Sequence, residues 1–311
     1  MSADWPEIPF EPWKDSCATL HLWTQIVGKY RLARTPWINH SWHATLYVTS
    51  RGLTTSEIPD GARAVQVDFD FIDHALIVSA SDGARQRFEL VPMSVADFHA
   101  RFREALRALG ANPAFHSSPN EVAEPIPFER DQQHAAYDAD AVQRFWHALV
   151  RIDRVFKHFR TGFLGKSSPV HLFWGSFDLA VTRFSGRPAP PHPGGVPALP
   201  DEVTREAYSH EVSSAGFWPG GGPIDYPAFY SYAYPTPEGF ASAEVEPREA
   251  VFDTALGEFL LPYDAVRSAG DPDATLLAFL QTTYAAAADL AAWDRAALDT
   301  ELGRPGVPRE A

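Results

Sequence analysis

Residues 64–91, AVQVDFDFIDHALIVSASDGARQRFELV, constrain the fold more than any other stretch of the chain. Apolar side chains alternate with polar ones at its start, at Val65, Val67, Phe69 and Phe71. This period of two is typical of a strand that buries one face. Further strand-like runs lie near 42–49, 75–80 and 86–91. The turn sequence Asp73-His74 separates the first run of the segment from 75–80, and Ser81-Asp82-Gly83 separates 75–80 from 86–91. The segment therefore predicts an antiparallel meander.

Helical periodicity frames these strands. We expect a first helix that begins at Asp15 or Ser16 and ends near Leu32, and a second that begins at Ser94 and ends at Gly110. The same order of elements then recurs. Its parts are a long amphipathic helix over 140–163, strand-like runs in 168–187 and near 208–215, 227–235 and 256–261, and a last helix from Asp271-Pro272 to about Asp299.

This recurrence predicts an α+β fold made of two similar helix–four-strand–helix units with antiparallel sheets, an internal duplication packed as one globule. The expected segments are a first unit over 1–110, a polar connector over 111–136, a second unit over 137–302 and a flexible tail over 303–311. The second unit contains a proline-rich loop at 186–203, which is either a lid or a tolerated insertion.

Charge and composition exclude several classes of protein. The formal net charge of −14 argues against nucleic-acid binding and against adhesion to anionic membranes. The single cysteine, Cys17, rules out an internal disulfide. The first residues lack the basic and apolar pattern of a signal peptide, and no apolar run is long enough to span a bilayer. We therefore expect a cytoplasmic protein.

The segment SPVHLFWGSFDLAVTRFSGR (168–187) combines aromatic and ionisable residues. As one continuous strand it places His171 on one face, and Trp174 and Asp178 on the other. Two interpretations are open. Asp178 faces a pocket with help from Arg183 or Arg187, or it forms a buried ion pair that closes the sheet.

A second concentration is AYSHEVSSAGFWPGGGP (207–223), followed by PAFYSYAYP. His210 and Glu211 are adjacent and so point to opposite faces of a strand, while Trp218 lies where it could cap a ligand. Tyrosines at alternate positions share one strand face, where they line a pocket or form a cross-strand aromatic ladder: Tyr230, Tyr232 and Tyr234.

The stretch NHSWHATLYVT contributes the histidines His40 and His43. Two imidazoles need a third ligand to hold zinc or iron, and His171, His210 or Glu211 could supply it. The alternative, which we favour, is that no metal is bound and the histidines hydrogen-bond within a polar cluster.

Together these stretches resemble a bacterial family catalogued as domain of unknown function 5996. The resemblance extends from about Trp5 to Arg295 and rests on long segments such as LHLWTQIVGKYRLARTPWINHSWHATLYVTSRGLTT, FDFIDHAL and GEFLLPYDAVR. The family implies no activity. It does imply which polar residues belong to its signature: Gln25, Lys29, His40, His43, His171, Asp178, Arg183, His210 and Glu211.

Two functions fit these residues. The first is an aromatic-lined polar pocket for a small molecule, with His171, Asp178, His210 and Glu211 as acid–base candidates, or with a metal. Its ligand-binding residues would be Gln25, Lys29, Trp174, Arg183, Trp218, Tyr230 and Tyr232. The second is a non-catalytic binding or interaction protein. In that case the same residues form a rigid core, and the aromatic surface meets a partner subunit such as a second copy of the chain.

Overall fold

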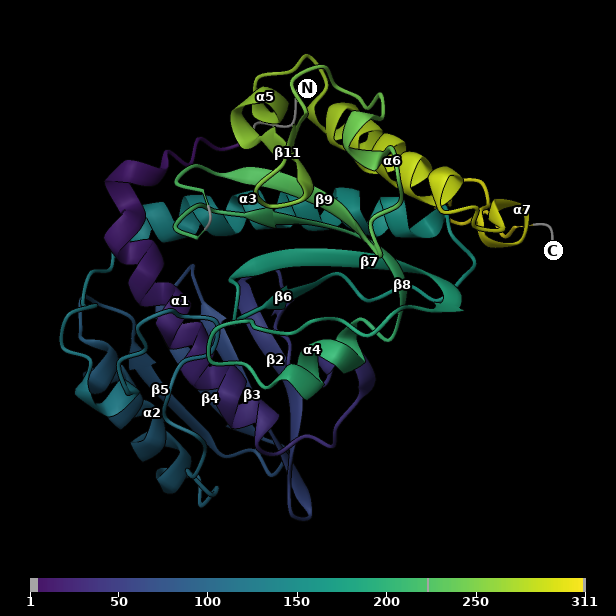
Figure 1. Ribbon diagram of the computed structural model, residues 1–311. Coiled ribbons are helices and arrows are strands. Elements are labelled where there is room, and N and C mark those ends of the chain that lie inside the picture. Colours follow the sequence, from purple (N-terminus) through teal and green to yellow (C-terminus); the bar gives the residue numbers. More distant parts are fainter. Residues whose placement is uncertain (1–4, 223, 310–311) are drawn as a thin grey trace.

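The computed structural model describes residues 5–222 and 224–309 and shows an α+β chain with two antiparallel sheets (Figure 1). The first sheet is a meander of five strands, and these are β1 Tyr47–Val48, β2 Gly52–Asp60, β3 Arg63–Asp70, β4 Ala75–Ala80 and β5 Arg85–Glu89. The meander predicted over 64–91 is confirmed by the pairing of β3 with β4 and of β4 with β5.

The strand β2 was not expected. Its sequence, GLTTSEIPD, lacks regular apolar alternation because a bulge shifts the register between Thr54 and Glu57. Ser56 lies within the bulge at φ 57°. The irregularity that a bulge introduces breaks the period of two on which strand prediction depends.

Most ends of the predicted helices follow their local signals, and the exceptions are the start of the first helix and the end of the last. In α2 (Val95–Ala108) the Ser94 hydroxyl accepts from the Asp97 N–H, and Gly110 ends the helix at φ 69°, as predicted. The first helix, α1 (Phe10–Leu32), begins five residues or more before the expected start. Ser16 does not cap it, because the Ser16 hydroxyl instead accepts from the Asp138 N–H at 2.9 Å.

The second half adds a six-stranded sheet in the order β10-β11-β9-β8-β7-β6. Its strands are β6 His171–Phe173, β7 Asp178–Pro188, β8 His210–Trp218, β9 Ala228–Tyr234, β10 Val251–Asp253 and β11 Glu258–Pro262. Its helices are α3 Ala139–Thr161, α4 Asp201–Ala207, α5 Tyr263–Arg267, α6 Pro272–Leu290 and α7 Arg295–Leu298.

We expected four strands in each half, and the described residues form five and six. The two sheets also differ in strand order, because β11 rather than β10 pairs with β9. The internal duplication therefore remains a hypothesis.

The last helix is shorter than expected, since α6 ends at Leu290 and the short α7 follows it. Within the tail that we expected to be flexible, the Gly303 N–H donates to the Thr161 hydroxyl at 2.8 Å. Residues 310–311 of that tail lie outside the described residues.

The two sheets meet edge to edge through Leu46 and Leu172, whose backbone groups exchange hydrogen bonds of 3.0 and 2.8 Å. α3 and α6 pack on one face of the second sheet, while α1 packs against α2, α3 and β2 and so links the halves (Figure 1). One hydrophobic core runs through both units. The opposite face of the second sheet, which carries the polar residues, is therefore left for loops and α4 to cover.

Candidate functional site: a buried polar cluster

The segment 168–187 is a hairpin and not the single strand that we expected. Residues 174–177 turn the chain between β6 and β7, so that Phe173 pairs with Asp178 and His171 pairs with Ala180. Residues directly opposite in an antiparallel pair share a face. His171 and Asp178 therefore lie on the same side of the sheet, and the predicted separation is wrong. The turn escaped prediction because it begins and ends with an aromatic residue, which is unusual in a turn. Phe177 also adopts φ 57°, a conformation that an aromatic residue rarely takes.

The face of the sheet that carries Asp178 also carries Thr182 of β7 and Ser214 of β8, whose hydroxyls lie 2.8 Å apart. On β9 the same face carries Tyr230 and Tyr232. We call it the polar face. It is covered by residues 189–207, which we call the cap (Figure 1). Of the proline-rich loop predicted over 186–203, residues 186–188 instead belong to β7 and residues 201–203 begin α4, so the cap consists of the remaining loop and α4. Tyr208, directly after the cap, shares a hydrogen bond of 2.8 Å with Tyr232. The proline-rich loop thus packs over the sheet rather than projecting away from it.

The connector meets the cap over this face. The Glu121 N–H donates to the Pro197 carbonyl at 2.9 Å, and the Asn120 side-chain amide donates to the Ala198 carbonyl. From the sheet, the Tyr234 hydroxyl donates to the Pro190 carbonyl at 3.0 Å. Two segments that the sequence pattern treated as loops therefore close one layer of buried polar side chains.

Asp178 lies at the centre of that layer with only 4% of its surface exposed. Its carboxylate accepts hydrogen bonds from the Ser176 and Tyr230 hydroxyls. Tyr230 lies over Gly216, where any larger residue would collide with its ring, and packs against Trp218 at 4.4 Å. Trp218 and Tyr230, which the sequence analysis named separately as ligand-binding candidates, are thus linked to Asp178.

The α1 side of the layer is built around Gln25. Its amide donates to the Asn120 carbonyl at 2.9 Å and accepts from the Asn120 N–H at 2.8 Å. One turn later, the Lys29 ammonium donates to the Asn120 side-chain oxygen and lies 5.8 Å from the Trp174 ring centroid. Gln25, Lys29 and Trp174, which the sequence singled out separately, therefore meet at the connector.

Burial shifts the pKa values of the acid–base groups in the layer toward neutral pH. It raises the pKa of Glu121 to about 7, with a further contribution from the charge of Asp178. It raises the pKa of Glu258 to about 8, again with help from Asp178. The pKa of Asp178 itself is raised by burial, and burial lowers the pKa of Lys29 to about 8 against the opposing charge of Glu121. We call this set, with Tyr208, Tyr230 and Tyr232, the buried polar cluster.

Four residues of the layer were not predicted as site residues from the sequence: His21, Glu121, Tyr208 and Glu258. Glu121 lies in the connector, where no pattern marks it, and Glu258 lies in an expected strand, in the family segment GEFLLPYDAVR, where a single acidic residue gives no signal of burial. His21 precedes Gln25 by one helical turn, and its Nε2 lies 2.9 Å from the Gly175 carbonyl and 3.1 Å from the Gln25 amide. That i, i+4 spacing of polar residues on a buried helix is the signal that could have found it.

Several predicted site residues lie elsewhere. Arg183 is on the opposite face of β7 from Asp178, 3.5 Å from the Phe159 ring centroid, and donates to the Phe159 carbonyl at the end of α3. Arg187 pairs with Glu211 at 2.7 Å. Neither arginine assists Asp178, because alternation along β7 directs Arg183 away and Glu211 holds Arg187.

The acid–base candidates other than Asp178 have structural partners. His171 is buried, with Nδ1 2.7 Å from the Pro169 carbonyl, and burial lowers its pKa to about 4. His210 and Glu211 both belong to β8 and so point to opposite faces, as predicted. His210 Nδ1 contacts the Ser209 hydroxyl at 3.1 Å, and Glu211 also accepts from Ser185.

His40 and His43 likewise bond within the protein. His40 Nδ1 lies 2.8 Å from the Ala207 carbonyl of the cap, and its Nε2 lies 3.0 Å from the Lys166 amine. His43 Nδ1 lies 3.1 Å from the Ile38 nitrogen. Within residues 5–222 and 224–309, no group of three or more histidine, cysteine, aspartate or glutamate side chains is placed to hold a metal.

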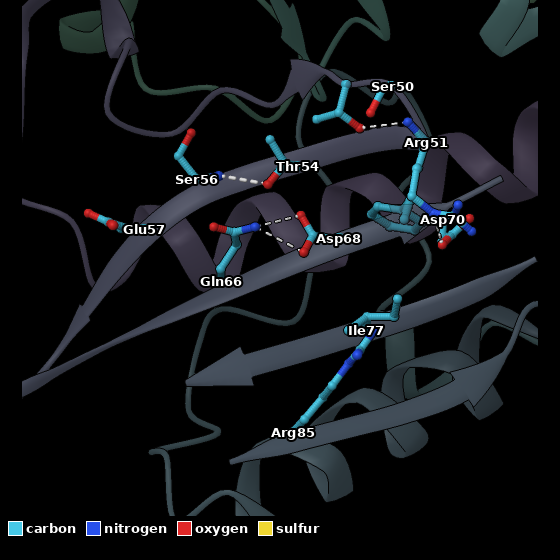
Figure 2. Close-up of a pocket in the computed structure, with 12 residues that line it drawn as sticks. Ser50, Arg51, Thr54, Ser56, Glu57, Gln66, Asp68, Asp70, Ile77 and Arg85 are labelled. Carbon is cyan, nitrogen blue, oxygen red and sulfur yellow. Dashed lines mark hydrogen bonds and ion pairs between the residues drawn. The ribbon is translucent and has the colours of Figure 1, made fainter. Parts of the chain in front are cut away.

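A separate hollow of about 650 Å³ opens on the outer face of the first sheet (Figure 2). It is lined mostly by polar residues that include Arg51, Glu57, Gln66, Asp68 and Arg85. Figure 2 shows the Gln66 amide directed at both oxygens of Asp68, each at 2.9 Å. This hollow is open, so its polar groups are accessible to solvent, whereas the buried polar cluster is covered.

Comparison with known proteins places the chain in a family. Residues 5–300 match a family of unknown function, DUF5996. The chain belongs to this family. No curated protein or solved structure shows significant similarity to it. None of the helices in the described ranges of this DUF5996 protein has the length and apolarity needed to cross a membrane. The function of this DUF5996 member must therefore be argued from its own side chains.

Proposed function

We propose that the buried polar cluster binds a small organic molecule beneath the cap, and that its carboxyl groups provide acid–base chemistry there. One observation carries the proposal. Glu121, Asp178, Glu258 and Lys29 are gathered in one layer, yet in the described part of the chain none of them forms an ion pair within 4.0 Å. Buried charges without partners are costly and concentrate at functional sites.

The hydrogen bonding of Glu258 supports a ligand. Its Oε2 is buried and has no hydrogen-bond partner among the described residues. Glu258 lies one position beyond the paired Ser231 and Phe259, on the same face as Tyr232. The charge of Glu258 also acts on Tyr208 and Tyr232. An unsatisfied carboxyl oxygen in such surroundings is an arrangement that a bound molecule would complete.

The pKa values support proton transfer. A general acid or base works best when its pKa is near the working pH, and Glu121 meets that condition with a pKa of about 7. Of the acid–base residues predicted from sequence, the proposal retains Asp178, as a charge that raises the pKa values of Glu121 and Glu258. The net charge of −14 favours a small molecule in the cytoplasm over nucleic acid or a membrane surface.

The second candidate is a structural polar core with no ligand. The complete hydrogen bonding of Gln25 favours it, because a core needs each buried donor and acceptor satisfied. In that case the cluster only rigidifies the junction of α1, the connector and the cap.

A ligand screen by thermal denaturation separates the two. The wild-type protein and the variants Glu258→Gln and Glu57→Gln are heated with a library of small carbonyl compounds, amines and carboxylates. We expect one chemical class to raise the Tm of the wild type and of Glu57→Gln by several degrees, and to act less on Glu258→Gln. A library that shifts no Tm, or shifts all three proteins equally, would support the structural core.

A further inference from the structure

Lysine is scarce in this chain and its use is selective. Only four of the 26 basic residues are lysines, and the others are arginines. Lys14 pairs with Glu11 at 2.5 Å and Lys157 pairs with Asp153 at 2.6 Å, both on exposed helix surfaces. Lys166 contacts His40 at 3.0 Å. Only Lys29 is buried in the protein interior, with 4% of its surface exposed.

The surroundings of Lys29 are not those of a structural cation. A buried lysine is ordinarily paired with a carboxylate. Within the described residues the Lys29 ammonium has a single hydrogen bond, to the Asn120 side-chain oxygen, and no ion pair within 4.0 Å. An ammonium has three donors. Two N–H groups therefore remain without a protein acceptor in that part of the chain, beside the flat surface of Trp174.

The chemistry of lysine explains why an arginine would not serve here. A guanidinium stays charged at any working pH, whereas a desolvated amine can lose its proton and become a nucleophile. Burial lowers the pKa of Lys29 to about 8, so that an appreciable fraction is neutral near pH 7. The proton donor needed next to such an amine is present, since Glu121 interacts with Lys29 electrostatically and its pKa is about 7.

We propose that Lys29 forms an imine with the carbonyl carbon of an aldehyde or ketone that enters the buried polar cluster. This inference rests on the proposed function, because the carbonyl compound is the small molecule bound beneath the cap. It names the chemical class of that molecule and assigns its attachment to one atom, Lys29 Nζ.

The step balances without a further reactant. The neutral Lys29 amine adds to the carbonyl carbon, the C=O π pair moves to oxygen, and a proton passes from nitrogen to that oxygen to give a carbinolamine. Glu121 then protonates the hydroxyl, the C–O bond breaks and water leaves. The products are a protonated imine, one water molecule and the Glu121 carboxylate.

The charge of the cluster suits this product. A protonated imine keeps the positive charge that Lys29 would otherwise have lost. The newly formed Glu121 carboxylate, which interacts electrostatically with Lys29, stabilises the imine relative to the free carbonyl compound. The carbonyl compound must reach Lys29 between residues 117–121 and the cap, which requires those two segments to separate.

Reductive trapping tests the inference. The full-length protein is incubated at pH 7 with butanal or benzaldehyde and sodium cyanoborohydride, and the alkylated lysines are located by peptide mass spectrometry. We expect Lys29 to be alkylated at least about tenfold faster than Lys157, because its lowered pKa leaves far more neutral amine. With only four lysines, each site is resolved separately.

Two variants provide the controls, with folding checked by circular dichroism. Lys157→Arg should lose one slow site and leave Lys29 unchanged. Glu121→Gln should slow the alkylation of Lys29 about fivefold or more, through loss of the proton donor, while Lys157 reacts as before. Alkylation confined to Lys14, Lys157, Lys166 and the terminal amine would overturn the inference.

The trapping result and the ligand screen together separate the two proposals. If compounds raise the Tm of the wild type but not of Glu258→Gln, and Lys29 is never trapped, the cluster binds a ligand without an imine. If neither result appears, the cluster is a structural core and both proposals are wrong.

Discussion

The outer face of the first sheet and the polar face of the second carry similar side chains in different surroundings. On the first, Asp70 is buried, which by itself would raise its pKa. Hydrogen bonds from the Arg51 guanidinium and from the N–H groups of Ile72 and Asp73 lower that pKa instead. On the second, the Asp178 carboxylate accepts from the Ser176 and Tyr230 hydroxyls and pairs with no cation among the described residues, and burial raises its pKa.

The difference lies in what covers each face. The first face opens into solvent in the hollow of Figure 2, where charged groups are hydrated or paired with arginine. The second lies beneath the cap and the connector, and it contains more carboxyl groups than cations. Covering an unpaired carboxyl costs stability, and proteins tolerate that cost at sites that function. Paired substitutions on the two faces test whether this comparison holds.

The largest difference in unfolding free energy is expected between substitutions at two residues that both have a positive φ. Phe177, at φ 57°, is buried and stacks on His21 at 5.0 Å, whereas Ser56, at φ 57°, lies in the bulge of β2. Phe177→Gly should cost about 3 kcal/mol, because the lost packing exceeds the relief of backbone strain. Ser56→Gly should stabilise by about 0.5–1 kcal/mol. Urea denaturation measures both, and equal effects would contradict the assigned packing of the turn.

The next pair removes one carboxylate from each face. Asp178→Ala leaves the Tyr230 and Ser176 hydroxyls without their acceptor in a buried layer and should cost about 2 kcal/mol. Asp68→Ala removes a carboxylate that accepts from Gln66 beside open solvent, and its effect should stay within about 0.5 kcal/mol. Chemical denaturation at pH 7 compares them. A cost at Asp68 that matched the cost at Asp178 would show that the two faces are equally shielded.

A third pair tests the pH dependence of stability. The folded pKa of Glu258, about 8, exceeds its ordinary value of 4.5. The folded state therefore binds more protons between these values, and stability falls as pH rises from about 4.5 to about 8. Glu258→Gln should be more stable than the wild type by about 1–2 kcal/mol above pH 8, with little difference below pH 4.5.

The matched control is Glu57→Gln, on the exposed first face. Its unfolding free energy is measured over the same pH range, as the reference for removing a carboxylate that is exposed to solvent. If Glu258→Gln follows the wild type across the whole range, Glu258 is hydrated and the cluster is open.

The smallest expected effect concerns Lys29. Its folded pKa of about 8 lies below the ordinary 10.5, so the unfolded state binds more protons between these values and wild-type stability rises with pH across that window. Lys29→Met should therefore gain about 1 kcal/mol at pH 7, after the lost Asn120 hydrogen bond is subtracted, and lose this advantage by about pH 10.5. Urea denaturation of the wild type and of Lys29→Met from pH 7 to pH 10.5 measures the difference, and a difference that stays constant over this range would contradict the burial of Lys29.

Much of the fold was predictable because the responsible signals are local. The Ser94 cap, the Gly110 ending and the alternation in β3 each depend on a few neighbouring residues. The turn at 174–177 and the bulge in β2 were missed because both depart from a regular period. These two features account for the missing strand of the first half and for one of the two missing from the second; the other, β10, has only three residues.

The candidate site was predicted only in part. Asp178, Tyr230 and Trp218 were found because they lie in aromatic strand sequences that meet in the second sheet. His171, Arg183, His210 and Glu211 were grouped with them by composition, yet each has its own partner elsewhere. Neither Glu121 nor Glu258 stood out, because an acidic residue in a loop or at a strand end is ordinarily solvated.

The sequence by itself determined the α+β class, the antiparallel meander and most helix boundaries, because these follow from backbone geometry and residue order over short distances. It also determined membership of the family, which depends on residue order alone. Only the tertiary structure decided that Lys29, Glu121, Asp178 and Glu258 share one covered layer. The acidity of these groups is set by burial and by charges from distant parts of the chain. Those surroundings come into existence only when the connector and the cap close over the second sheet.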